Sequence, residues 1–201
     1  MRPGAVLQAV RIFREQGGIL RTTQAIDLGI HPRVLYQMRD TGLVAQLSRG
    51  VYRLKSLPAL GQPDLVTVAL RVPRAVLCLV SALSLHDITT EIPHEVQIAL
   101  PRGTKSPVLD QPPVRVFRFS GVALTQGIQV IVMGGVKVRV YGPEKTVADC
   151  FRFRNKLGLG VAIEALHLCI TRRRSQPADL LRYARVCRVE KVMLPYLQAR
   201  Q

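Results

Sequence analysis

The chain has 201 residues, 48% of them hydrophobic, and carries 29 Lys and Arg against 13 Asp and Glu. This length suits one large domain or two small ones, and the apolar content excludes disorder of the whole chain. The net charge of +16 favours polyanionic partners, because each basic side chain that neutralises a phosphate releases counterions. Nucleic acid is therefore the leading class of partner. No apolar run is long enough to indicate a membrane span.

The positive charge is concentrated toward the two ends of the chain. Residues 1–60 carry a net charge of +6 and residues 137–201 a net charge of +9.

The four cysteines are Cys78, Cys150, Cys169 and Cys187. They form no CxxC pair and lie among apolar residues, which predicts buried free thiols rather than a metal site. The first residues lack the apolar core of a signal peptide, so we expect a cytoplasmic protein, with no cofactor or metal.

The amino-terminal part of the chain has the pattern of a winged helix-turn-helix. Residues 4–16 have apolar side chains at helical spacing and predict a first helix. Residues 19–54 carry the rest of the motif. There, Thr22 or Thr23 is expected to cap a short helix, and Gly29 suits the tight turn between two helices that cross steeply.

The second helix of the motif is expected to run from His31, as its N-cap, to about Thr41. Its apolar side chains recur at helical spacing and should point inward; they are Val34, Leu35 and Met38. Its other face is polar. Arg33 suits guanine and Gln37 suits adenine in the major groove, because each side chain can form two hydrogen bonds to the base edge.

A β-hairpin is predicted after this helix, with a turn at Ser48-Arg49-Gly50. Such a hairpin is the wing of the motif, and its tip would hold Arg49 against phosphates or the minor groove. Arg53, on the second strand, is a further candidate. The predicted DNA-binding residues are Thr23, Arg33, Tyr36, Gln37, Arg39, Arg49 and Arg53.

A linker rich in Pro and Gly is predicted at residues 57–63, between a DNA-binding domain at 1–56 and a second domain at 64–201. The second domain should begin with a helix at 64–71, capped by Asp64. Residues 74–86 favour a helix, although their periodicity also fits a buried strand. Strands are expected at residues 95–100, 114–119, 128–133 and 136–141, with a tight turn at Gly134-Gly135. Helices are expected at about 143–157, 161–173, 178–187 and up to residue 197, so the predicted class is α+β.

The second domain lacks the sequence pattern of a metal-dependent nuclease. A metal-dependent nuclease would need a Glu-x-Lys pattern on a strand, and only the adjacent pair Glu144-Lys145 occurs. Lys145, Asp149 and Arg152 fall on one helix face and are interpreted as surface pairs. We therefore expect no enzymatic activity.

Basic residues in the second domain also suggest a second surface for nucleic acid or an acidic partner; they are Arg152, Arg154, Lys156, Arg172, Arg173, Arg174, Arg182 and Arg185.

Three segments of the chain resemble the AbiE-type (AbiEi) antitoxins of type IV abortive-infection toxin–antitoxin systems. They are GVYRL, SALSLHDITTEIPHEVQIALPRG and GPEKTVADCFRFRNKLGLGVAIEAL, and the resemblance extends from about residue 18 to about residue 190. It implies a winged helix-turn-helix that represses its own operon by binding inverted repeats in double-stranded DNA. It also implies a carboxy-terminal domain that counters a nucleotidyltransferase-like toxin.

The sequence thus predicts a sequence-specific repressor that is also an antitoxin, acting as a monomer or a homodimer. The first alternative is an interaction protein that neutralises a toxin and binds DNA only secondarily. The second, weaker alternative is a metal-dependent nuclease.

Overall fold

The computed structural model describes residues 3–199 and divides into two compact units, each described by itself below. Unit 1 comprises the chain up to Pro73 together with residues 108–112 and 131–138. Unit 2 comprises residues 74–107, 113–130 and the chain from Arg139 onward. Both units combine helices with a sheet, which confirms the predicted α+β class.

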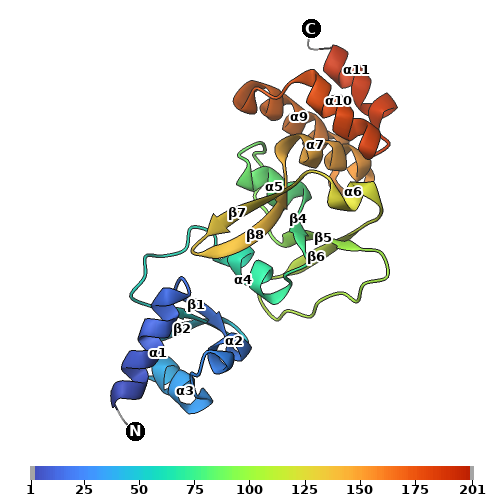
Figure 1. The fold of residues 1–201 in the computed structure, drawn as a ribbon. Helices are drawn as coiled ribbons and strands as arrows, with labels where there is room; N and C mark the ends of the chain where they lie inside the picture. The colour runs from blue at the N-terminus through green and yellow to red at the C-terminus, as the bar shows by residue number, and fades with distance from the viewer. Residues whose placement is uncertain (1–2, 200–201) are drawn as a thin grey trace. The chain divides into compact units, whose positions relative to one another are not determined.

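Unit 1 contains three helices, a small sheet and a fourth helix (Figure 1). In chain order these are α1 (Pro3–Glu15), β1 (Ile19–Arg21), α2 (Thr22–Asp27), α3 (Pro32–Asp40), β2 (Val44–Ser48), β3 (Val51–Leu54) and α4 (Pro63–Arg71). The sheet has the order β1-β3-β2, and both pairings are antiparallel. The strand β1 was not expected, because its three residues are too few to show a period.

The core of unit 1 joins α1, α3 and the sheet. Phe13, Leu35 and Met38 are fully buried in it, and Leu54 of β3 is 2% exposed. The periodicity of residues 4–16 therefore correctly predicted α1, although Leu7 on this helix is 71% exposed. Burying side chains of this size contributes about 1.5–3 kcal/mol each, so these contacts hold α3 firmly against α1.

Two details of unit 1 differ from the expectations. The N-cap of α2 is Arg21 rather than a threonine, and Gln24 Oε1 accepts a hydrogen bond from the Arg21 backbone N–H at 3.1 Å. The helix α4 begins at Pro63, with Gln62 as its N-cap, so Asp64 lies in the first turn instead of capping it.

The helix α4 belongs to unit 1, whereas the sequence suggested that it opens the second domain. Its Val66 is 1% exposed and packs against Ile19 of β1 and Val51 of β3. This contact joins residues far apart in the chain, so the Pro- and Gly-rich segment before α4 is a loop within unit 1.

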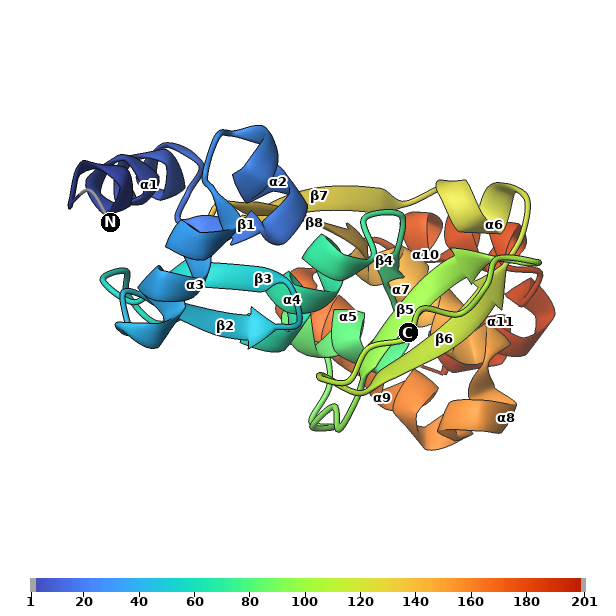
Figure 2. The same cartoon turned by 90° about the horizontal axis from the view of Figure 1, so that it is seen from below.

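Unit 2 is built on a five-stranded mixed sheet in the order β6-β5-β4-β8-β7. Its strands are β4 (Val76–Leu77), β5 (Val96–Pro101), β6 (Val114–Phe119), β7 (Ile128–Met133) and β8 (Val136–Tyr141). Residues 131–138, at the tip of the β7–β8 hairpin, belong to unit 1. Its helices are α5 (Leu79–Leu85), α6 (Val122–Thr125), α7 (Pro143–Arg152), α8 (Arg154–Leu157), α9 (Leu159–Arg173), α10 (Pro177–Val186) and α11 (Glu190–Gln198). The helices α9, α10 and α11 gather around α7 (Figure 2).

The four strands that the sequence predicted in this region are present, and the turn at Gly134-Gly135 has the positive φ angles that a tight hairpin needs. The segment 74–86 is not one helix, because it holds the short strand β4 before α5. The helix that begins at Pro143 stops at Arg152, and Gly160 lies inside α9 rather than before it. The helix α6 was not expected.

A buried ion pair lies in the core of unit 2, where the sequence suggested a surface pair. Lys145 Nζ lies 2.5 Å from Asp149 Oδ2, and both side chains are 0% exposed. Cys187 Sγ donates to the other carboxylate oxygen of Asp149 at 3.2 Å, and the ammonium group lies 4.1 Å from the centre of the Tyr141 ring. Burial raises the pKa of Asp149, and Lys145 opposes that shift. The i, i+4 spacing was read correctly, but the burial of the pair was missed.

The cysteines are free and buried, as predicted. Burial raises the pKa of the Cys169 thiol to about 11. None of the helices among residues 3–199 is both long and apolar enough to cross a membrane, and these residues form no cluster of three or more side chains that could hold a metal ion.

His86, at the end of α5, gives a pH-dependent prediction. Its Nε2 lies 2.7 Å from the carbonyl oxygen of Tyr141, and burial lowers its pKa below the usual 6.5, with a smaller contribution from the charge of Arg173. Because the folded state holds this ring neutral, its stabilising contribution is complete above pH 6.5 and declines as the pH falls through the folded-state pKa. The urea midpoint should thus fall more between pH 7.5 and 5.5 for the wild type than for His86→Gln. Equal losses would show that His86 does not contribute.

Candidate nucleic-acid interface

The start of α3 is fixed by local hydrogen bonding. His31 is the N-cap residue, and its Nδ1 accepts the backbone N–H of Arg33 at 3.2 Å. Pro32 occupies the first helical position, where a missing N–H costs nothing. Both features were predicted from the sequence. Together they fix the first residue of α3 and therefore the position of Arg33 in its first turn.

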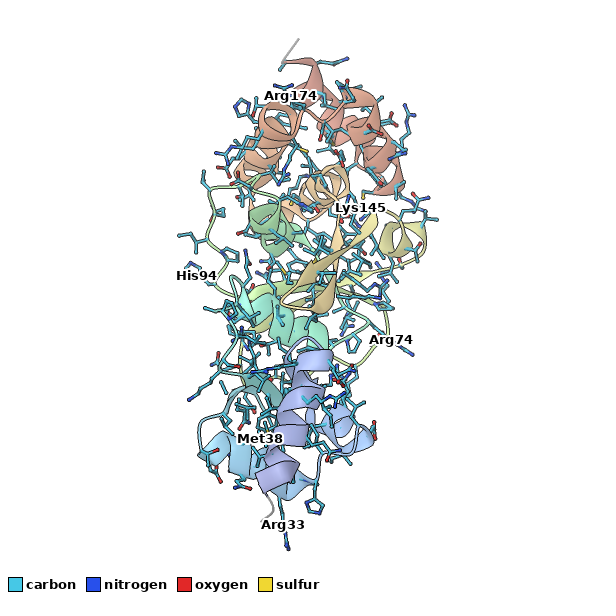
Figure 3. All side chains as sticks on the ribbon, turned by 60° about the vertical axis from the view of Figure 1, so that its left-hand side comes forward. Arg33, Met38, Arg74, His94, Lys145 and Arg174 are labelled. Atoms are coloured by element: carbon cyan, nitrogen blue, oxygen red, sulfur yellow. The ribbon has the colours of Figure 1, made fainter. Side chains whose placement is uncertain are left out.

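The two faces of α3 divide as the helical spacing predicted. The apolar face is buried, and Met38 lies among packed side chains (Figure 3). The opposite face is exposed and includes Arg33, Tyr36 and Gln37, with Arg33 extending away from the ribbon in Figure 3. Among residues 3–199, the side chains of Arg33 and Gln37 have no hydrogen-bond or ion-pair partner. They are therefore available to an external partner.

Arg39 is placed differently on the same helix. Its guanidinium lies 2.8 Å from Asp40 Oδ1 and 5.2 Å from the centre of the Tyr36 ring. These contacts hold Arg39 beside Tyr36 and pair it with a neighbouring carboxylate. Tyr36 is still 44% exposed to solvent.

The turn of the β2–β3 hairpin is anchored to the rest of unit 1. Gly50 has φ +73°, which favours glycine, and its carbonyl accepts the backbone N–H of Thr22 at 2.9 Å. The carbonyl of Arg49 accepts a hydrogen bond from Arg71 Nη1 at 2.7 Å. The Arg49 side chain is exposed, so the anchored turn presents it to solvent.

Two further arginines in unit 1 were missed by sequence reasoning. Arg21 and Arg71 line a cavity of about 240 Å³, together with Thr22, Thr23 and Gly50. Burial lowers the pKa of Arg21, and the nearby charge of Arg71 lowers it further. Two guanidinium groups thus repel each other across a small cavity, which is an arrangement that an anion would relieve. No local sequence signal marks them, because a short strand and α4 bring them together.

Arg53 has a structural role within unit 1. Its guanidinium donates to the carbonyl oxygens of Leu57, at 3.4 Å, and of Pro58. The side chain is only partly exposed and fixes the loop that follows β3. Arg53 is therefore left out of the interface that we propose below.

Most of the predicted second basic surface is engaged within unit 2. Arg172 binds Asp87 at 3.0 Å, Arg182 lies 3.5 Å from Asp179, and Arg185 lies 2.8 Å from Glu190. Two other members donate to backbone carbonyl groups: Arg173 to His86 and Arg154 to Phe151. Two lie against aromatic rings: Lys156 over Phe117, and Arg152 beside Phe119 and Phe153. Arg174 is exposed. They are spread over α7, α8, α9 and α10 and the residue after α9, and three of them already form ion pairs with carboxylates.

Comparison with known proteins finds a family match in the amino-terminal part of the chain. Residues 8–55 match the family described as "Transcriptional regulator, AbiEi antitoxin". This match confirms the resemblance from about residue 18 to residue 55; from there to about residue 190 it stays a prediction. The fold is similar to that in the crystal structure of the RV2827C protein from Mycobacterium tuberculosis, with a TM-score of 0.60 and 15% identity over 91% of this chain and 72% of that chain. No curated protein matches the sequence.

Proposed function

We propose that unit 1 is a winged helix-turn-helix that binds double-stranded DNA, with α3 in the major groove and the β2–β3 hairpin as its wing. The observation that carries this proposal is the polar face of α3. It presents Arg33, Tyr36 and Gln37 to solvent on a helix whose other face is buried against α1. An exposed recognition helix followed by a hairpin with a basic tip is the arrangement such domains use.

Each exposed side chain has a role that its chemistry suits. Arg33, near the start of α3, would donate two hydrogen bonds to guanine, and Gln37, one turn later, would pair with adenine. Tyr36 would contact a phosphate or a thymine methyl group. Arg49 would bind the phosphate backbone from the tip of the wing. Arg21 and Arg71, with Thr23 beside them, would hold a second backbone phosphate.

The regulatory part of the proposal is repression of the operon that encodes this chain, together with neutralisation of a partner toxin. The family match supports a regulator or antitoxin, and the net charge of +16 supports a polyanionic target. The alternative, a toxin-binding protein with incidental DNA affinity, assigns no role to the unpaired side chains of α3.

A reporter experiment tests this function in cells. The promoter upstream of the gene would drive a reporter, and the full chain would be supplied in trans as wild type or as the double variant Arg33→Ala/Gln37→Ala. We expect the wild type to repress and the double variant to lose repression at equal protein level. Co-expression with the adjacent gene separates the roles, because the double variant should still protect against a toxin encoded there. Full repression by the double variant would refute readout by α3.

Arg49→Ala tests the wing. Its removal should weaken binding to all DNA sequences similarly and reduce the slope of log K against log salt concentration by about one unit, because one phosphate contact is lost. Fluorescence anisotropy titrations at four salt concentrations would measure this slope. Arg14→Ala, an exposed arginine on α1, removes the same charge elsewhere and should leave the slope unchanged. An unchanged slope for Arg49→Ala would remove this residue from the phosphate contacts.

A further inference from the structure

Unit 2 contains a cavity of about 670 Å³ that the proposed DNA interface does not use. Arg102, Arg152 and Arg188 all line it. They come from three parts of the fold: the loop after β5, the last turn of α7 and the turn between α10 and α11. Such a volume is typical of small-molecule sites.

The charges around this cavity are unbalanced. No Asp or Glu is among its lining residues. Within residues 3–199, none of Arg102, Arg152 and Arg188 forms an ion pair with a carboxylate. Asp149, the buried acid of unit 2, is already paired with Lys145 at 2.5 Å. Three arginines without an ion-pair partner among the described residues therefore line one space, and an anion of multiple charge would neutralise them.

Arg152 is held in place before any ligand binds. Its guanidinium carbon lies 5.6 Å from the ring centres of both Phe119 and Phe153. Cation–π contacts of this kind restrict a long side chain, so less conformational entropy is lost on binding. The planar guanidinium can thus donate two parallel hydrogen bonds to two oxygens of a phosphate.

The rest of the wall is mostly apolar; it includes Val122, Ala123 and Val186, with Ser120 as a polar member. Such a wall suits the organic part of a ligand, and an inorganic ion would leave it unused. We propose that this cavity binds an organic phosphate of nucleotide size, with its phosphates on the three arginines and its organic group on the apolar wall. This inference does not depend on DNA binding by unit 1.

Calorimetric titration of the full chain with ATP, in 0.15 M NaCl, tests the proposal. We expect ATP to bind with one-to-one stoichiometry and adenosine not to bind. Arg152→Met keeps an unbranched apolar side chain beside the two phenylalanines and should weaken ATP binding at least about tenfold, through loss of a charge-assisted hydrogen bond. Arg188→Gly should do the same without loss of stability, because Arg188 has φ +59°, where glycine is favoured.

Two controls make the result specific. Arg182→Met removes the same charge from α10, outside the cavity lining, and should leave ATP affinity within about twofold of the wild type. Arg33→Ala should likewise leave ATP binding unchanged, which separates this cavity from the DNA interface. The proposal is overturned if ATP does not bind, if adenosine binds as well as ATP, or if Arg182→Met weakens binding as much as Arg152→Met.

Discussion

Replacing Lys145 by Met should lower the free energy of unfolding by about 3–5 kcal/mol, because it leaves the Asp149 carboxylate buried without its cation. Both side chains are 0% exposed, and the only other side-chain hydrogen bond to Asp149 among residues 3–199 comes from the thiol of Cys187, a weak donor. Urea unfolding at pH 7, followed by circular dichroism, would measure the loss.

The double variant Lys145→Met/Asp149→Leu provides the decisive comparison. It removes both charges, so most of the stability lost in Lys145→Met should return. The exposed pair Arg182–Asp179 is the matched control, since its side chains are 64% and 50% exposed and Arg182→Met should cost at most about 1 kcal/mol. A loss of under 1 kcal/mol for Lys145→Met would mean that the ion pair does not stabilise unit 2.

Arg33→Ala should weaken binding to the cognate operator by about 1–3 kcal/mol and relax specificity at one base pair. The reason is that a guanidinium near the start of α3 forms two hydrogen bonds to one guanine edge, whereas a phosphate contact does not depend on sequence. Anisotropy titrations on operator variants would locate that base pair. Arg14→Ala should leave both affinity and base preference unchanged. An equal loss on operator and on unrelated DNA would place Arg33 at the phosphate backbone instead.

The helices of unit 1 could be predicted because their signals are local. His31 and Pro32 mark the start of α3, and the helical spacing of its apolar residues assigned its buried face correctly. The strands β1 and β4 were missed because they contain only three and two residues, fewer than a period-two pattern needs. The sequence did not predict that α4 belongs to unit 1, because its packing against β1 and β3 leaves no local signal in the sequence.

Tertiary contacts also explain the differences in the candidate sites. Spacing showed that Lys145 and Asp149 are neighbours on one helix face, but the helices that cover this face are set by packing around α7. The sequence predicted Arg53 as a DNA contact, because nothing local shows that its guanidinium donates to carbonyl oxygens of the loop after β3. Arg21 and Arg71 are separated by 50 positions, and only the folded unit brings them together.

The most direct test of DNA recognition by α3 is a competition titration of the full chain. Labelled DNA from immediately upstream of the gene would be bound at 0.15 M NaCl and displaced by unlabelled DNA, either the same sequence or a shuffled one of equal length. We predict a preference for the upstream sequence by a factor of about 10³ or more, which Arg33→Ala/Gln37→Ala reduces at least about tenfold. Equal and salt-sensitive binding to both DNAs, unaffected by the double variant, would contradict the account, because binding would then reflect net charge alone.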